Sequence, residues 1–398
     1  MRINRSWRHL LLLNVLVLPF IVHAAPFIPD NDNTLVEELP LDPADTNGME
    51  LRKLRAILTR TPDDLMLAET VAQRYIEQSR RDSDPRYLGY AQAALAPWWD
   101  QPQPPVAVLV LRAIVRQANH EFVPALTDLN AALQRDPGNA QALLTRASIE
   151  QARGDYPAAR KTCMKLTPLT DKIVGYTCLA AVLSLNGQAA RSYALLKQFM
   201  IQAPPQIDME HQWIDGLLAE MAERCGMTEA AQKHYQATMA TGTPNSYLLA
   251  SYADFLLDTD QSSLVVSLLR DRTRADPLLL RLTIAESNLK LASAPAHIAA
   301  LRARFDASRL RGDVLHRREQ ARFELALQNN PDIALKLAEE NWSVQREPAD
   351  VRIFLEAALA NNSPQRALPV LAWLDKTHLE DVRLAALIND FKRMNHAL

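Results

Sequence analysis

The segment from Val106 to Pro137, VAVLVLRAIVRQANHEFVPALTDLNAALQRDP, decides how the rest of the chain is interpreted. Its apolar residues recur every three to four positions in two runs, which predicts two amphipathic helices. The polar stretch Asn119-His120-Glu121 separates the runs, and the proline of Asp136-Pro137 stops the second one. The segment therefore predicts a hairpin of two short antiparallel helices.

This hairpin pattern repeats along the chain. A small or β-branched residue recurs at intervals of 34, 34, 33, 39 and 34 residues, and we call such a series of equivalent positions a column. A second column lies four residues after the first, and a third lies twelve residues before it. The columns are Ala91, Ala125, Ala159, Ser192, Ala231 and Val265; Leu95, Leu129, Cys163, Leu196, Tyr235 and Leu269; and Ser79, Ala113, Ala147, Ala180, Ala219 and Ala253. Small side chains let two helices approach closely. The columns therefore predict an array of helical hairpins.

The segment Gly154-Asp155-Tyr156-Pro157-Ala158-Ala159 and the packing positions Ala113, Phe122, Ala125, Leu129, Ala132 and Pro137 resemble the tetratricopeptide repeat family, whose unit is a 34-residue helix-turn-helix. The resemblance is to a divergent exported bacterial member. It implies an all-α fold, an α-solenoid of about nine antiparallel helical hairpins wound into a right-handed superhelix. We expect the solenoid to span residues 49–398, with the clearest repeats at 72–277 and degenerate repeats and a cap at 278–398.

Beyond Pro277 the pattern weakens but continues. It predicts helices over 278–293, 296–310, 314–328, 331–345, 349–360, 364–376 and 380–394, with the small-residue column passing through Ala299, Ala334 and Ala367. The alternative is a repeat array that ends at Pro277 and a separate helical bundle after it. We also expect a longer inter-repeat loop at 204–209, where the spacing widens to 39.

The composition narrows the class of protein. Only 10 of 398 residues are glycine and 48% are hydrophobic, which argues against an all-β and a mostly disordered chain. The 44 basic and 46 acidic residues nearly cancel, so no overall charge favours nucleic acid as a partner.

The amino terminus predicts export. Three arginines precede an apolar run from Leu10 to Val22 that is too short to cross a membrane, and Val22-His23-Ala24 fits a signal-peptidase site. We expect a signal peptide at 1–24, a flexible acidic leader at 25–48, and a periplasmic or secreted protein without a transmembrane segment in its mature chain. An uncleaved membrane anchor is the alternative.

No catalytic motif stands out. Residues 25–398 have no His-Glu-x-x-His helix, phosphate-binding glycine loop or nucleophile elbow, so we expect no enzyme activity, metal or cofactor. The arginines between Arg302 and Arg322 alternate with acidic residues and predict a solvated mixed-charge face. Trp98-Trp99 predicts packing between repeats. An enzyme site that uses His316 and Glu319 is a minor alternative.

The three cysteines are Cys163, Cys178 and Cys225. Cys163 falls on the second helix of one predicted hairpin and Cys178 on the first helix of the next, so these two are candidates for a disulfide in an oxidising compartment. The sequence leaves open whether they pair or remain buried thiols, because the required Cα separation is narrow.

The predicted array of helical hairpins indicates a binding function. Stacked hairpins present an extended concave surface, which suits a non-catalytic scaffold or adaptor that binds a peptide or protein partner, for example in envelope assembly or export. The inward positions of the first helices define the predicted partner-binding groove: Gln117, Gln141, Gln151, Trp213, Glu220, Tyr247, Asp254, Arg281, Asn288 and His316. A polysaccharide-associated envelope protein, with Trp98, Trp99 and Trp213 contacting sugar, is the alternative. The sequence does not indicate the partner's identity or the oligomeric state.

Overall fold

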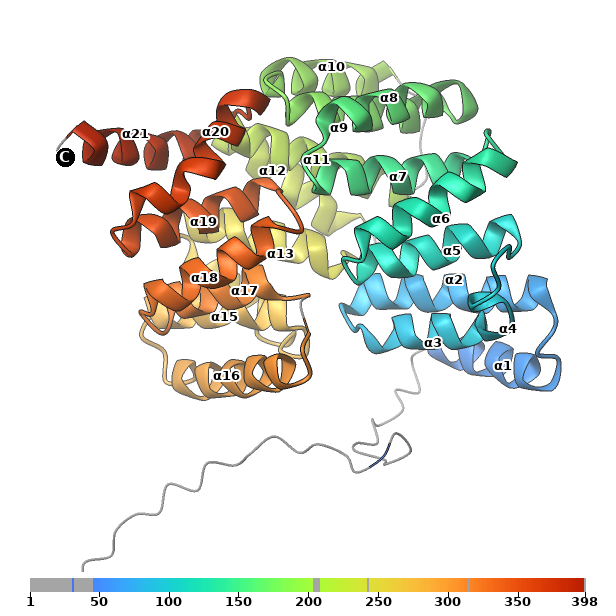
Figure 1. The fold of residues 1–398 in the computed structure, drawn as a ribbon. Helices are drawn as coiled ribbons and strands as arrows, with labels where there is room; N and C mark the ends of the chain where they lie inside the picture. The colour runs from blue at the N-terminus through green and yellow to red at the C-terminus, as the bar shows by residue number, and fades with distance from the viewer. Residues whose placement is uncertain (1–30, 32–45, 203–207, 242, 314, 397–398) are drawn as a thin grey trace, which may run out of the picture. The chain divides into compact units, whose positions relative to one another are not determined.

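The computed structural model describes residue 31 and residues 46–202, 208–241, 243–313 and 315–396 (Figure 1). The predicted signal peptide at 1–24 lies outside the described residues, as does the predicted leader except for residues 31 and 46–48. Most of the loop expected at 204–209 also lies outside them. All the described helices belong to one compact unit of the chain.

Every regular element in the described ranges is helical, with 21 α-helices and two short 3₁₀ turns. The helices are α1 (Thr46–Arg60), α2 (Leu65–Asp82), α3 (Arg86–Ala94), α4 (Ala96–Trp99), α5 (Val106–Ala118), α6 (Phe122–Arg135), α7 (Ala140–Ala152), α8 (Tyr156–Leu166), α9 (Lys172–Ser184), α10 (Ala189–Gln202), α11 (Asp208–Arg224), α12 (Thr228–Ala240), α13 (Ser246–Asp258), α14 (Ser262–Leu269), α15 (Asp276–Asn288), α16 (Ala294–Leu310), α17 (Arg317–Ala326), α18 (Pro331–Trp342), α19 (Pro348–Ala360), α20 (Leu368–Thr377) and α21 (Val382–His396). The 3₁₀ turns are η1 (Thr167–Leu169) and η2 (Pro364–Ala367).

Successive helices pack as hairpins. Nine such pairs run from α2 with α3 to α19 with α20, the intervening pairs being α5–α6, α7–α8, α9–α10, α11–α12, α13–α14, α15–α16 and α17–α18. The predicted all-α array of about nine helical hairpins is therefore confirmed. The helix expected at 364–376 is divided between η2 and α20, and the expected 380–394 helix is α21, which packs against α19.

The predicted small-residue columns lie largely in the core, although Ala180 of the third column is half-buried. Ala91, Ala125, Ala159, Ala231 and Val265 have no exposed surface, and the column that follows them by four residues is equally buried. The extension past Pro277 holds at Ala334 and Ala367, which are fully buried. It is wrong at Ala299, which is exposed.

The buried face of α16 explains the error at Ala299. The buried face contains Leu301 and Phe305 instead, and Leu301 lies two residues after Ala299. A two-residue shift turns a helix by about 200°, so a column that is followed at the wrong register changes from core to surface.

Each of the nine hairpin turns contains one residue in the left-handed region of backbone conformation. These residues are Ser83, His120, Gly154, Gly187, Gly226, Asp260, Lys290, Asn329 and Asn362, with φ between 48° and 72°. A residue in this conformation ends the first helix and redirects the chain. Six of the nine carry a side chain, so the turn itself does not demand glycine.

A later part of the chain lies directly against all three glycine turns. A Cβ on Gly154 would stand 2.8 Å from Cζ2 of Trp373, one on Gly187 would stand 3.2 Å from Cβ of His378, and one on Gly226 would stand 3.3 Å from Cγ1 of Val382. We call residues 373–383 the closing segment. It crosses the turns of three consecutive hairpins, and glycine leaves the space for it.

Polar contacts and a shared core hold the closing segment. The side-chain amide of Asn186 donates to the Thr377 carbonyl at 2.6 Å, and the Ala189 amide donates to the Glu380 carboxylate at 2.8 Å. One buried cluster combines side chains of α7–α9 with those of α17–α21, including the Tyr156 and Trp373 rings at 5.8 Å between centroids. In Figure 1 the red α20 accordingly lies against the green helices of the middle hairpins. Hairpins far apart in sequence are therefore packed together.

Candidate binding site on the first-helix face

The first helices of successive hairpins share one surface, which we call the first-helix face. A recess of about 290 Å³ opens on it between α13, α15, α17, α19 and α21. Its aliphatic lining residues are Leu257, Ile284, Leu325, Ala326, Pro348, Ala349 and Ile353. Its charged lining residues are Asp254, Asp258, Arg281, Arg318, Glu319, Arg322, Arg352, Glu356 and Arg383, and Asn288 also lines it. The recess is therefore amphipathic, with five arginines and four carboxylates.

Asp254 on α13 bridges two arginines of the recess. Its two oxygens accept from Arg281 Nη2 at 2.6 Å and from Arg322 Nη1 at 2.5 Å. Burial opposes ionisation of the carboxyl group, but these two guanidinium groups outweigh it and hold the pKa of Asp254 well below its usual range. Asp254 is therefore a fixed negative charge that ties α13 to α15 and α17.

Asp258, one turn further along α13, makes the second bridge. It accepts from Arg352 at 2.5 and 2.8 Å and lies 3.7 Å from Nη1 of Arg383. Arg383 also binds Glu223 of α11 at 2.6 Å and Asp381 at 2.6 Å. The charges at the recess thus connect α11 and α13 to the closing segment.

Glu223 differs from the other carboxylates of this network. Its side chain is 9% exposed, and burial raises its pKa to about 7 although Arg383 opposes the rise. The Tyr235 hydroxyl donates to its second oxygen at 3.0 Å. Glu223 therefore titrates near neutral pH at the contact between α11 and the closing segment.

Arg318 and Glu319 are charged lining residues of the recess at the start of α17. Burial opposes ionisation of Glu319, but Arg318 and Arg281 lower its pKa to about 2. Arg318 donates to Glu347 at 2.8 Å and to Asp350 at 3.3 Å, the two residues that form the capping box of α19. The start of α19 is therefore fixed to α17.

Glu220 and Tyr247 form a polar pair elsewhere on the first-helix face. The Tyr247 hydroxyl donates to Glu220 at 2.6 Å, while Tyr247 as a whole is 60% exposed. Burial raises the pKa of Glu220, and the neighbouring Glu220 charge raises that of Tyr247. The pair presents the Tyr247 ring to solvent beside a half-buried carboxylate.

The structure brings only some of the predicted groove residues together. Asp254, Arg281 and Asn288 line the recess, and Glu220 meets Tyr247. The others lie outside the recess lining: Gln117 and Gln151 are half-buried, Gln141 is exposed and donates to Thr145 at 3.1 Å, Trp213 is exposed, and His316 precedes α17.

Sequence reasoning missed Arg352, Arg383 and Asp258, and it misjudged part of the arginine run. The prediction of a solvated mixed-charge face suits Arg309 and Arg311, which are more than 60% exposed in pairs with acidic neighbours. It is wrong for Arg318 and Arg322, whose side chains are 25% exposed and line the recess. Charge alternation along the chain does not reveal which residues another helix covers.

The recess suits binding by charge and shape better than acid–base chemistry. A general acid needs a pKa near the working pH, whereas Glu319 is held ionised by its arginines. No group of three or more potential metal ligands occurs among the described residues. Within the same residues, no helix has the length and apolar character needed to span a bilayer.

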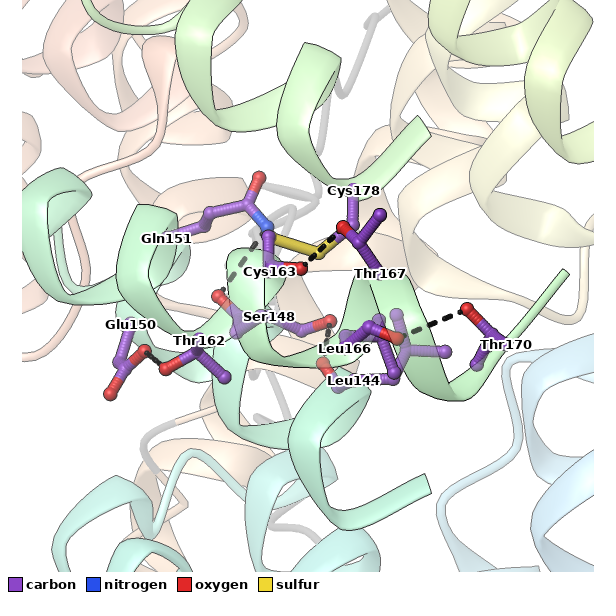
Figure 2. Close-up of a disulfide and its surroundings, with 11 residues drawn as sticks. Leu144, Ser148, Glu150, Gln151, Thr162, Cys163, Leu166, Thr167, Thr170 and Cys178 are labelled. Carbon is purple, nitrogen blue, oxygen red and sulfur yellow. Dashed lines mark hydrogen bonds between the residues drawn. A yellow bond between two sulfur atoms is a disulfide. The ribbon is translucent and has the colours of Figure 1, made fainter. Parts of the chain in front are cut away.

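The two remaining sequence predictions concern tryptophan and cysteine. Trp98 and Trp99 are half-buried against the amino-terminal core, and Arg116 lies over the Trp99 ring at 5.9 Å, as expected for packing. A disulfide joins Cys163 of α8 to Cys178 of α9, with 5.6 Å between the Cα atoms (Figure 2). Cys225 is a partly exposed free cysteine.

Comparison with known proteins gives one curated relative and several similar folds. No family model matches the chain. Cellulose synthase 1 operon protein C of Komagataeibacter xylinus is 25% identical over 293 residues, which cover 67% of this chain. The match covers 22% of the relative's own length.

Three solved structures illustrate the fold similarity. The Cut9–Hcn1 hetero-tetramer of APC/C gives a TM-score of 0.40 at 14% identity, with 78% of this chain and 52% of that chain covered. The P58(IPK) TPR domain gives 0.23 at 13%, covering 87% and 99%. Yeast Tom70 gives 0.24 at 11%, covering 89% of each chain. Scores at this level carry no information about a site or a partner.

Proposed function

We propose that this chain, a tetratricopeptide-like array of helical hairpins, is a non-catalytic scaffold that binds a peptide or protein partner on its first-helix face. The observation that carries the proposal is the recess: four first helices and the closing segment bring aliphatic and charged side chains together in one lining. Its volume of about 290 Å³ lies at the lower end of the range for ligand sites, which suits one or two inserted side chains of a partner.

The predicted groove residues keep their role in this proposal. Asn288 is exposed at the recess, and the exposed Tyr247 ring with Glu220 offers a second contact point on the same face. Residues 1–24 act as a signal peptide and 25–48 as a leader, so the partner is met outside the cytoplasm. Residues 49–398 act as the array.

Site-specific photocrosslinking tests the first-helix face. The crosslinking amino acid p-benzoylphenylalanine replaces Tyr247 or Asn288 in the full-length chain, and Val123, which is 66% exposed on the second helix α6, is the matched control position. We expect the same protein adduct from positions 247 and 288 after irradiation of cells, and none from position 123. Adducts that are identical at all three positions, or absent at all three, would contradict the proposal.

A second candidate function is association with a polysaccharide-producing envelope assembly. The name of the curated relative, protein C of a cellulose synthase operon, supports it. Of the three tryptophans predicted to contact sugar, Trp213 is 40% exposed, whereas Trp98 and Trp99 pack against the core. Titration with cello-oligosaccharides should therefore change the fluorescence of the wild type but not of Trp213→Phe. Unchanged wild-type fluorescence would exclude direct sugar binding through Trp213.

A further inference from the structure

A second groove lies between α6, α7 and α8. It encloses about 520 Å³, and all its lining residues fall between 133 and 165, so it shares none with the recess. Leu133, Pro137, Leu143 and Pro157 supply its apolar lining. We call this pocket the α8 groove. Its shape depends on two neighbouring hairpins only.

A buried polar wall gives the α8 groove a defined geometry. Glu150 and Thr162 are each 5% exposed. One oxygen of Glu150 accepts from Arg146 Nε at 2.8 Å and the other from the Thr162 hydroxyl at 2.6 Å, the bond drawn next to the disulfide in Figure 2. Arg146 Nη1 donates in turn to Asn130 at 2.9 Å. The only buried carboxylate of the groove is thus fully engaged by the protein itself.

The α8 groove carries a net positive charge, because Arg146 pairs with Glu150 and the remaining charged lining residues are two lysines and one aspartate. Lys161 and Lys165 line it from one side of α8, one helical turn apart, and both are exposed. Within the described part of the chain, neither ammonium group makes an ion pair or a side-chain hydrogen bond. Asp155 is the remaining acidic lining residue, and one of its oxygens accepts from the Ala158 amide at 3.2 Å as the cap of α8. The groove therefore offers two cations without an ion-pair partner, together with aliphatic lining residues.

The spacing of these cations fits a polypeptide. Residues four apart on a helix have Cβ atoms about 5–6 Å apart. Alternate side chains of an extended strand are spaced by about 6.6 Å, so two carboxylates at positions i and i+2 match the two ammonium groups. None of the lining residues is aromatic, so the groove has no flat ring on which a sugar would stack. The disulfide at Cys163, between the two lysines, anchors this part of α8 to α9.

We propose that the α8 groove binds an acidic segment of a partner protein. Alternate carboxylates of the segment pair with Lys161 and Lys165, and an aliphatic side chain of the same segment packs on Leu133 and Leu143. The α8 groove is separate from the recess, so the scaffold has two binding sites that take ligands of different chemistry.

Fluorescence anisotropy with a defined probe tests the proposal. The probe is a fluorescein-labelled twelve-residue peptide in which glutamate alternates with leucine and alanine, titrated with the full-length chain at low salt. We expect Lys161→Glu combined with Lys165→Glu to weaken binding at least about tenfold, because two attractions become repulsions. The matched control, Lys172→Glu combined with Lys233→Glu, changes the net charge equally at exposed positions outside the groove, and it should stay within about twofold of wild type.

Two further titrations identify the chemical class of the ligand. The same peptide with glutamine in place of glutamate should bind at least about tenfold more weakly, and oligoglucuronate should not displace the acidic probe. Circular dichroism melts of both double variants confirm that they are folded. Three outcomes would overturn the proposal: no binding of the acidic peptide, an equal loss in the two double variants, or oligoglucuronate that binds as tightly as the peptide.

Discussion

Replacement of Gly154 by alanine tests the packing of the closing segment on the hairpin turns. Gly154 has φ of +72°, and an added Cβ would lie 2.8, 3.1 and 3.2 Å from three atoms of the Trp373 indole. Gly312 is a matched control, because its φ is +74° and nothing lies within 4 Å of an added Cβ. Both substitutions place alanine in the left-handed backbone region, and they differ only in whether the added Cβ collides with the Trp373 ring.

The magnitudes follow from these two contributions. Alanine in the left-handed region costs about 1 kcal/mol at either position. Overpacking against a buried ring adds about 1–3 kcal/mol at position 154 only. We therefore expect Gly154→Ala to lower the free energy of unfolding by about 2–4 kcal/mol and Gly312→Ala by about 1 kcal/mol, measured by urea denaturation followed by circular dichroism.

A double-mutant cycle assigns the difference to the indole ring. With Trp373→Ala as the background, the added methyl group meets no ring, so Gly154→Ala should cost no more than Gly312→Ala. Equal costs of the two glycine substitutions in the wild-type background would refute the reasoning, because they would mean that Trp373 does not press on the turn.

Three other expectations concern the disulfide and the ion network. Replacement of both Cys163 and Cys178 by serine should lower stability by about 3 kcal/mol for a loop of 15 residues, and a reductant should lower the melting temperature of the wild type but not of this variant. The pKa of Glu223 rises from 4.5 to about 7 on folding, so the native state binds more protons and the free energy of unfolding should fall as pH rises from about 4.5 to 7. Glu223→Gln should make the urea midpoint less dependent on pH over that range. An unchanged dependence of the midpoint on pH in this variant would contradict the assignment. Asp254→Ala removes the carboxylate partner of the buried Arg281 guanidinium, which then keeps its bonds to the Ala250 and Pro277 carbonyls, and should cost about 3–5 kcal/mol. Asp271→Ala, in a pair with side chains 73% and 91% exposed, should cost under about 1 kcal/mol. Similar urea midpoints for the two variants would show that the buried bridge is unimportant.

Much of the repeat architecture was readable from local patterns. The columns through Ala125 and Leu129 predicted which helix faces are buried, because a helix core position recurs at a fixed interval and needs a small or apolar side chain. The prolines and the Asn and Gly turns marked the ends of the helices for the same local reason. The error at Ala299 arose where the interval changed and the register was lost.

The candidate site was less predictable than the fold. Asp254 and Arg281 were found because each lies on the inward side of its own first helix, a local property. Arg352 and Arg383 escaped notice because nothing in their neighbourhoods in the sequence shows that they meet Asp258 across about 100 residues of chain or more. One signal was present but not recognised: glycine occupies the turn position at 154, 187 and 226, where the closing segment covers it.

The sequence by itself determined the elements of this protein: helices, their pairing into hairpins and the buried side of each pair. These properties depend on residues within about 40 positions of one another, where helix periodicity and turn chemistry apply. Only the tertiary structure decided that the ninth hairpin returns to the turns of the third, fourth and fifth, and with it where the recess forms. That contact depends on the accumulated rotation between successive hairpins and on side chains such as Trp373 and Arg383, which have no periodic relation to the residues that they meet.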